Sequence, residues 1–198
     1  MQFKTVIAVA LGLLSTSSFA AITAESLIAD IDVLTALSTS AMNHLSSLTP
    51  SNNPGQVSDQ AQTLITNMNT MTRDASGDTM DTAGTTKFSD ADATLILTSL
   101  DAFTTAHQSF LTTVIKKHLI FAQFGMTAPI AAVFRQWEAA MDAFGFTMQD
   151  AFPESGSSGL SKDLAALHNS IENTVTTYAQ VCVPSPLYPT VQPVCIPT

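Results

Sequence analysis

The sequence predicts an all-α fold, a bundle of about five amphipathic helices, and three observations lead to this prediction. Apolar residues recur at steps of three and four along most of the chain, which is the period of one helix face. Helix-start and helix-stop signals divide this pattern into segments of helical length. No segment shows a convincing strand pattern. Because each segment is apolar on one face only, these faces must meet in one core.

Residues 1–20 predict a secretion signal peptide rather than part of the fold. Lys4 supplies the positive start, and residues 6–14 form a short apolar run before small residues suited to cleavage. This run is shorter than the roughly 20 residues that a bilayer span needs, and no later stretch is as apolar, so no transmembrane segment is expected. We expect a secreted protein, extracellular or in a cell wall, with a helical domain over 21–181 and a Pro-rich tail over 182–198.

The first two helices follow this signal. The first ends at the Thr49-Pro50 pair, and the Asn-Asn-Pro-Gly sequence at 52–55 is a turn. Its predicted buried face comprises Leu27, Ile31, Leu34, Ser38, Ala41, Leu45 and Leu48. The second helix is predicted to end at Gly77, with a loop over 78–87. Its predicted buried face comprises Val57, Ala61, Leu64, Met68, Met71 and Ala75.

The third helix has the best start signal. The Ser89 hydroxyl can cap it while Asp92 reaches back, which is a capping-box arrangement, and Gly125 can end it. At about 1.5 Å per residue it would be about 50 Å long, so we expect a break near 116–118. Its predicted buried face comprises Ala93, Ile96, Leu100, Phe103, His107, Phe110, Val114 and Phe121.

Two further helices complete the bundle. Thr127 is predicted to cap the fourth, with Pro129 tolerated in its first turn. Its buried face comprises Ile130, Phe134, Trp137, Met141, Phe144, Met148 and Ala151. Residues 153–159 are predicted as a flexible connector, and Ser161 as the cap of the fifth helix. The buried face of that helix comprises Leu164, Leu167, Ile171, Val175 and Tyr178.

The tail carries the two cysteines of the chain. In an oxidising compartment Cys182 and Cys195 are expected to form a disulfide with each other, and five nearby prolines stiffen the loop that it closes. We predict no metal site here, because two sulfurs without a nearby histidine cannot fill a tetrahedral shell.

The charge of the chain narrows the choice of partners. There are 7 basic and 16 acidic side chains, and loss of Lys4 with the signal leaves a net charge near −10. Such a chain repels phosphate backbones and anionic membrane surfaces, so no nucleic-acid partner is expected. Only 12% of residues are charged, and a surface that is polar mainly through hydroxyl groups suits O-glycosylation.

Several segments together resemble a known family. They are the run from Val114 to Phe121 before Gly125, the opening helix at 28–45, the start at 89–92 and the closing helix at 171–178. In order and spacing they resemble the fungal hydrophobic surface-binding protein A family, whose domain also builds cell-wall galactomannoproteins of the Mp1p type. The resemblance covers roughly residues 22–179. The Pro-rich tail is not part of it.

The resemblance implies secretion, a helical bundle, and one of two binding modes. Members of this family either adsorb to hydrophobic surfaces or hold a fatty-acid-like chain in a central cavity. Some members are thought to bring secreted lytic enzymes to hydrophobic polymers. The expected partner is therefore a lipid or a hydrophobic surface, with cell-wall polysaccharide or lytic enzymes as further candidates.

Soft, large side chains on the inward faces are the candidate ligand-binding residues. Met adapts to irregular gaps and is common on promiscuous apolar binding surfaces, although such stripes also fill ordinary cores. We hypothesise that part of this set lines an apolar tunnel between the third and fourth predicted helices. The candidates are Leu34, Leu64, Met68, Met71, Leu100, Phe103, His107, Phe110, Val114, Phe134, Trp137, Met141 and Phe144.

Polar residues near this set allow two interpretations each. His107 could donate a hydrogen bond to a ligand carboxylate, or it could be a satisfied core residue; Gln108 and Gln123 are alternative anchors. Lys116 and Lys117 could meet a carboxylate head group, or they could simply favour a helix C-terminus.

No catalytic motif is present. The sequence has no Gly-X-Ser-X-Gly elbow, no His-Glu-X-X-His pair and no phosphate-binding glycine loop, so neither enzymatic activity nor a cofactor is expected. The leading interpretation is a secreted, non-enzymatic binder of lipids or hydrophobic surfaces. The alternative is a structural cell-wall galactomannoprotein.

Overall fold

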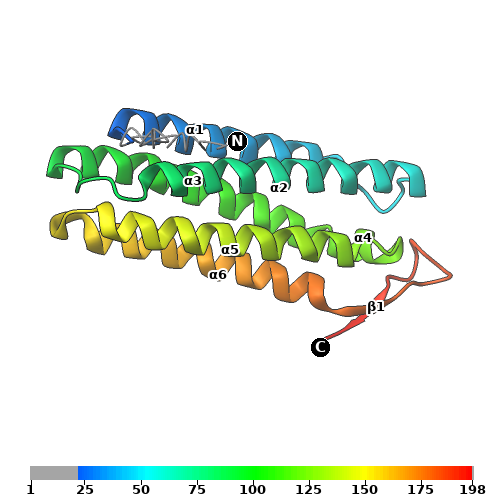
Figure 1. Ribbon diagram of the computed structural model, residues 1–198. Helices are drawn as coiled ribbons and strands as arrows, with labels where there is room; N and C mark the ends of the chain where they lie inside the picture. Colours follow the sequence, from blue (N-terminus) through cyan, green and yellow to red (C-terminus); the bar gives the residue numbers. More distant parts are fainter. Residues whose placement is uncertain (1–21, 198) are drawn as a thin grey trace, which may run out of the picture.

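The computed structural model describes residues 22–197, so the predicted signal peptide lies outside the described residues. Within them, six α-helices are joined by short connections, and two short strands close the chain (Figure 1). This confirms the predicted all-α bundle. The elements are α1 (Ala24–Ser46), α2 (Pro54–Thr82), α3 (Asp90–Lys116), α4 (His118–Gln123), α5 (Thr127–Ala151), the 3₁₀ helix η1 (Glu154–Gly156), α6 (Ser157–Ala179), β1 (Val181–Val183) and β2 (Val194–Ile196).

The five long helices form a closed ring. Helix α1 packs against α2 and α3, α5 packs against α2 and α6, and α3 packs against α6. Each long helix therefore has two neighbours and turns its remaining apolar surface toward the centre of the ring. No helix within residues 22–197 is both long enough and apolar enough to cross a membrane.

Successive long helices run in opposite directions, so the connections between them lie alternately at the two ends of the bundle (Figure 1). The C-terminal strands lie at one end, together with α4 and the connection between α1 and α2. There the Lys117 Nζ donates a hydrogen bond to the Leu48 carbonyl over 2.7 Å. At the other end the Phe88 N–H donates to the Ala151 carbonyl over 2.9 Å. We call these the hairpin end and the far end.

The predicted buried faces are largely confirmed. Every position predicted for the faces of the first four helices is buried in one continuous core. In the fifth predicted helix, Leu167, Ile171 and Tyr178 are buried, whereas Leu164 and Val175 pack partly buried against the core. Periodicity is a reliable guide here because a helix face is fixed by local geometry alone.

The interruption of the third predicted helix is also confirmed, since α3 ends at Lys116 and α4 begins at His118. The start of α3 is capped as predicted, with the Ser89 Oγ accepting from the Asp92 N–H over 3.1 Å. The Asp92 carboxylate reaches back to the Ser89 hydroxyl rather than to its backbone N–H. A complete capping box occurs instead at the start of α2, between Asn53 and Gln56.

The predicted end of the second helix at Gly77 is wrong. Helix α2 continues to Thr82, and Asp78 and Thr82 extend its buried face beyond the glycine. The chain turns at Gly84 instead, where a φ of 78° places the backbone in the left-handed region that favours glycine. The predicted loop over 78–87 therefore shrinks to its second half.

Two predicted helix starts also differ. Thr127 is the first residue of α5 rather than its cap, and Met126 precedes it without a side-chain cap. The predicted connector over 153–159 is largely helical, with η1 running into α6 at Ser157. Tertiary packing explains this earlier start, because Leu160 extends the buried face by one turn and is itself 1% exposed.

The tail contains the strands that the sequence did not predict. Strands β1 and β2 pair antiparallel, with Val181 opposite Ile196, Cys182 opposite Cys195, and Val183 opposite Val194. The predicted disulfide between Cys182 and Cys195 is present. Each strand has three residues, which is too short for an alternating pattern to identify it.

Candidate functional site

The thirteen candidate ligand-binding residues lie together in the interior of the ring. They come from α1, α2, α3 and α5, and the most exposed of them, Met141, is only 5% exposed. The interior of the ring is thus a continuous apolar core built from leucine, methionine and aromatic side chains. That these residues bind a ligand stays a prediction.

A polar network crosses this apolar interior. The Trp137 Nε1–H donates to His107 Nε2 over 2.9 Å, and His107 Nδ1 lies 2.9 Å from the Ser38 Oγ. Because Nε2 accepts, the neutral ring carries its proton on Nδ1 and donates it to Ser38. The Ser38 hydroxyl in turn donates to the Leu34 carbonyl over 2.9 Å. Three helices, α1, α3 and α5, are therefore linked through one satisfied chain.

Burial keeps this histidine neutral. The His107 side chain is fully buried, and desolvation lowers its pKa from 6.5 to about 3. Protonation of Nε2 would also set two N–H donors against each other at Trp137. Phe103, Phe110 and Trp137 surround the imidazole with ring centroids 5.2 to 5.5 Å away. His107 would have to give up an existing partner in order to bind a ligand carboxylate.

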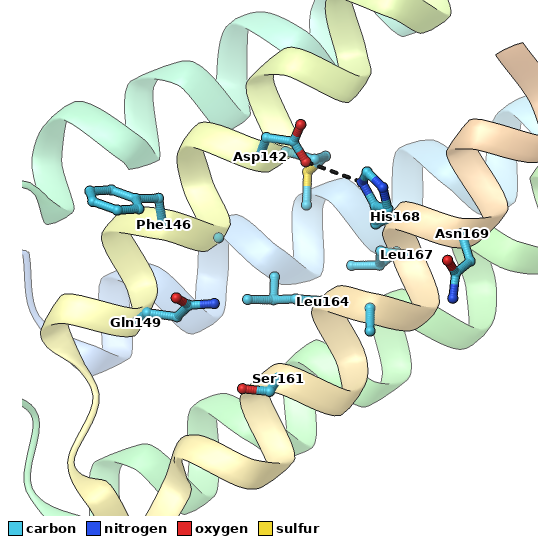
Figure 2. A pocket seen from close by; sticks show the side chains of 11 residues that line it. Asp142, Phe146, Gln149, Ser161, Leu164, Leu167, His168 and Asn169 are labelled. Carbon is cyan, nitrogen blue, oxygen red and sulfur yellow. Dashed lines mark hydrogen bonds and ion pairs between the residues drawn. The ribbon is translucent and has the colours of Figure 1, made fainter.

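A groove runs between α5 and α6 (Figure 2). Its volume is about 420 Å³, within the range of small-molecule pockets. Met141 and Leu167 belong to the core and line the groove, whereas Phe146 is 70% exposed. The lining residues are Met141, Asp142, Gly145, Phe146, Gln149, Ser161, Leu164, Ala165, Leu167, His168 and Asn169.

Small residues explain the close approach of the two helices at the groove. A Cβ at Gly145 of α5 would lie 3.2 Å from the Leu164 side chain of α6, so a larger residue would push that leucine aside. The rim is polar, where His168 Nδ1 lies 3.3 Å from the Asp142 carboxylate, an ion pair only when the histidine is protonated. The groove therefore has an apolar floor, a polar rim and an aromatic side chain beside it.

Sequence reasoning did not find this groove. The predicted tunnel was placed between the helices that became α3 and α5, whereas the groove lies between α5 and α6. Met141 is the one member of the candidate set that lines it. The available signal was the small residue Gly145 within an otherwise bulky helix, but its facing partner could be known only from the order of helices around the ring.

The other polar candidates hold the hairpin end together. Lys117 contacts the end of α1 through Leu48, whereas Lys116 is exposed. Gln123 exchanges two hydrogen bonds with the backbone of Ser185, of 3.0 and 2.9 Å. Gln108 donates to the Ala166 carbonyl and to Ser170 on α6.

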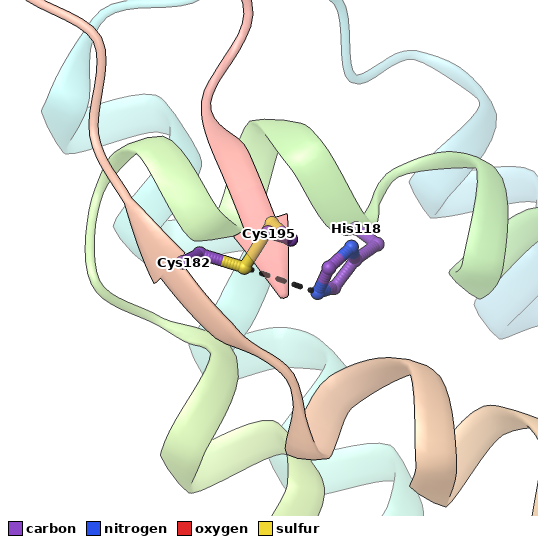
Figure 3. A group of neighbouring side chains, drawn as sticks. All are labelled: His118, Cys182 and Cys195. Carbon is purple, nitrogen blue, oxygen red and sulfur yellow. Dashed lines mark hydrogen bonds between the residues drawn. A yellow bond between two sulfur atoms is a disulfide. The ribbon is translucent and has the colours of Figure 1, made fainter. Parts of the chain in front are cut away.

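His118 corrects one step of the sequence argument. No histidine is expected near the cysteines, but His118 Nε2 lies 3.7 Å from the Cys182 sulfur (Figure 3). The His118 ring also packs edge-on against Tyr178. His118, Cys182 and Cys195 are close enough to share a metal ion geometrically. However, the two sulfurs are bonded to each other, so they do not offer the thiolate ligands that a zinc site uses.

The fold and the interior define the class of protein: an all-α bundle whose five long helices surround one apolar core. No protein-family model matches the sequence, and no curated protein matches it either. Solved structures do match. Ligand-binding domain 1 of the Penicillium marneffei MP1 protein, complexed with arachidonic acids, has a TM-score of 0.70 at 9% identity, covering 79% of this chain and 99% of that domain.

Two further structures agree with this comparison. Afmp4p in complex with palmitic acid has a TM-score of 0.63 at 14% identity, covering 79% of this chain and 100% of that one. Ligand-binding domain 2 of the Penicillium marneffei MP1 protein, complexed with multiple arachidonic acids, has a TM-score of 0.67 at 12% identity, covering 78% and 93%. This chain therefore has an Mp1p-type fold.

Proposed function

We propose that this protein is a secreted, non-enzymatic binder of fatty-acid-like lipids, which it holds in the apolar interior of the five-helix ring. One observation carries the proposal. The chain shares its fold with domains that were solved with arachidonic and palmitic acid, over 99% and 100% of those chains.

The chemistry of the interior supports an acyl ligand. Each CH₂ group removed from water contributes about 0.8 kcal/mol, so a long acyl chain has ample affinity for such an environment. Met68, Met71 and Met141 are buried, and methionine side chains rearrange readily around an irregular ligand. We propose that an acyl chain enters through the groove between α5 and α6 and displaces Met141 on its way inward.

The resemblance to hydrophobic surface-binding protein A supports a finer proposal. The finer proposal is that the protein also adsorbs to hydrophobic surfaces, in or near a fungal cell wall. Polysaccharide and lytic-enzyme partners would follow from the same resemblance.

Binding of palmitic acid tests the main proposal. Native mass spectrometry of the protein incubated with palmitic acid is expected to show a stoichiometric complex. Trp137, the single tryptophan, lies among the candidate residues and is hydrogen-bonded to His107, so its emission should change during the titration. Shorter fatty acids should bind more weakly, by about 0.8 kcal/mol for each CH₂ removed. A protein that stays empty and whose emission does not change would refute the proposal.

A pair of matched variants tests whether the acyl chain enters through the groove between α5 and α6. Ala165 is exposed and lines the groove, so Ala165→Phe should fill the groove without disturbing the core. Ala139→Phe is the control, because Ala139 is exposed on α5 and does not line the groove. Slower or weaker palmitate binding is expected for Ala165→Phe alone. Equal binding by both variants would mean that the ligand enters elsewhere.

A structural cell-wall galactomannoprotein is the second candidate function. Its support is a surface poor in charge, with 12% charged residues in the chain and many exposed serines and threonines. Fractionation of the secreting organism separates the two functions. Recovery only from covalently bound wall material, without lipid, would favour the structural role.

A further inference from the structure

Exposed apolar side chains are concentrated on the C-terminal hairpin. Among the described residues, eleven large apolar side chains are exposed, and six of them lie between residues 181 and 196. We call these six the hairpin patch. It comprises Val181, Val183, Leu187, Val191, Val194 and Ile196. Clustering of this kind marks an interaction surface, whereas scattered exposed residues do not.

The register of the strands explains the patch. Alternate residues of a strand point to opposite faces, and the two cysteines are directly opposite each other. The cysteines therefore occupy the face toward His118 (Figure 3). The flanking pairs, Val181 with Ile196 and Val183 with Val194, occupy the other face, where all four are more than half exposed.

The hairpin that carries the patch is fixed to the bundle without any binding partner. The disulfide closes the hairpin, and the two hydrogen bonds between Gln123 and Ser185 attach it to the bundle. Phe124 also contacts Tyr188 edge-on, with ring centroids 5.9 Å apart. A surface that is already ordered loses little entropy on binding.

Charge is distributed unequally between the two ends of the bundle. In the half of the bundle nearest the hairpin, the connections included, three acidic and three basic side chains balance each other. The far half carries thirteen acidic and three basic side chains. The segment from residue 180 onward has no charged side chain at all. The hairpin patch can therefore approach an apolar phase without desolvating a charged side chain of its own or bringing an acidic face against it.

We propose that the hairpin patch docks this protein onto the surface of a lipid bilayer, with the acidic far end directed into water. The four strand side chains, with Leu187 and Val191, insert at the interface between the bilayer and water. Exposed Lys116 at the same end can pair with an anionic head group. The inference builds on the proposed function, because a lipid binder must meet the lipid phase, and it identifies where that meeting occurs.

A second copy of the chain fits the patch less well. Each strand has three residues, and Pro184, Pro193 and Pro197 flank them, so a neighbouring strand could add few hydrogen bonds at either edge. A lipid surface needs none, because it buries side chains without pairing the backbone.

Vesicle co-sedimentation with phosphatidylcholine vesicles, with and without phosphatidylserine, tests the proposal. The variant Val181→Thr, Val183→Thr and Val194→Thr keeps side-chain shape and strand preference but adds hydroxyl groups. It should lower vesicle affinity by about tenfold or more, which is about 1.4 kcal/mol. Val33→Thr is the matched control, because Val33 is 50% exposed in the far half of α1, and it should bind vesicles like the unchanged protein.

Three results would overturn the proposal. The first is that the unchanged protein does not bind vesicles, and the second is that the triple variant binds them equally well. The third is a dimer, seen by sedimentation velocity, that the triple variant dissociates, since the patch would then be a self-association surface. Palmitate binding measured without vesicles should be the same in the triple variant. If the unchanged protein does not bind palmitate, the proposed function is refuted, and the vesicle result still tests the docking surface by itself.

Discussion

At the scale of single residues, the chain from Trp137 through His107 to Ser38 is the most specific feature of the interior. Every hydrogen on this chain has an acceptor, so it links three helices without leaving a buried donor unpaired. Apolar side chains alone would allow helices to slide or rotate, since dispersion contacts are not directional. A satisfied polar chain fixes their relative positions.

Ser38→Ala tests this network. The substitution leaves the His107 Nδ1–H without an acceptor in a dry environment, which should cost about 1–3 kcal/mol of unfolding free energy. Thr39→Ala is the matched control, because Thr39 is exposed and its hydroxyl makes the same kind of bond, to the Thr35 carbonyl. Urea denaturation followed by Trp137 emission measures both. Equal losses in the two variants would show that the network contributes nothing beyond a local hydroxyl bond.

At the scale of elements, helix ends were set by packing more than by local stop signals. Helix α2 runs through Gly77, and its buried face continues at Asp78 and Thr82. Glycine within a helix costs roughly 0.5–1 kcal/mol relative to alanine, a cost that does not end the helix here. The real end comes at Gly84, where the backbone needs a positive φ.

Gly77→Ala should therefore stabilise the protein by about 0.5–1 kcal/mol. A Cβ at Gly77 would meet no atom within 4 Å, so nothing opposes the gain in helix preference. Gly84→Ala should destabilise by roughly 1 kcal/mol instead, because of its positive φ. Thermal unfolding of the two variants provides the comparison. A destabilised Gly77→Ala protein would mean that α2 ends near residue 77.

At the scale of the whole molecule, two buried titratable groups act on stability in opposite directions. Burial, reinforced by Asp30, Asp74 and Asp81, raises the pKa of Asp78 from 3.8 to about 7. The folded state thus binds this proton more tightly than the unfolded state, and stability falls as pH rises from about 4 to 7. The lowered pKa of His107 does the reverse, since stability falls as pH drops from 6.5 toward 3.

Asp78→Asn isolates one of these opposing contributions. Because Asp78 is 7% exposed and one of its carboxylate oxygens has no hydrogen-bond partner, the neutral amide should stabilise the protein above pH 7 by roughly 1–3 kcal/mol. Near pH 4 the variant and the unchanged protein should be almost equally stable. Urea denaturation at pH 4, 6 and 8 measures this, with Asp59→Asn as the same change at an exposed position of α2. A stability difference that does not vary with pH would contradict the assignment.

The sequence alone determined which face of each helix is buried and where the third helix breaks. Both are local properties, because a helix repeats every 3.6 residues whatever surrounds it. It also indicated the disulfide, since the tail holds the only two cysteines of the chain. The candidate interior residues followed from the same periodicity, and all of them are buried.

Only the tertiary structure decided the order of helices around the ring, and several features follow from that order. The His107–Trp137 hydrogen bond joins residues 30 apart, and the Ser38–His107 bond joins residues 69 apart. Three other features likewise depend on which elements become neighbours. They are the groove at Gly145, the contact of His118 with the disulfide, and the end of α2 at Thr82 rather than at Gly77. Periodicity predicts which face of each helix is buried, but it does not predict which helix packs against that face. The hydrophobic effect is non-directional, so any other apolar face can bury it.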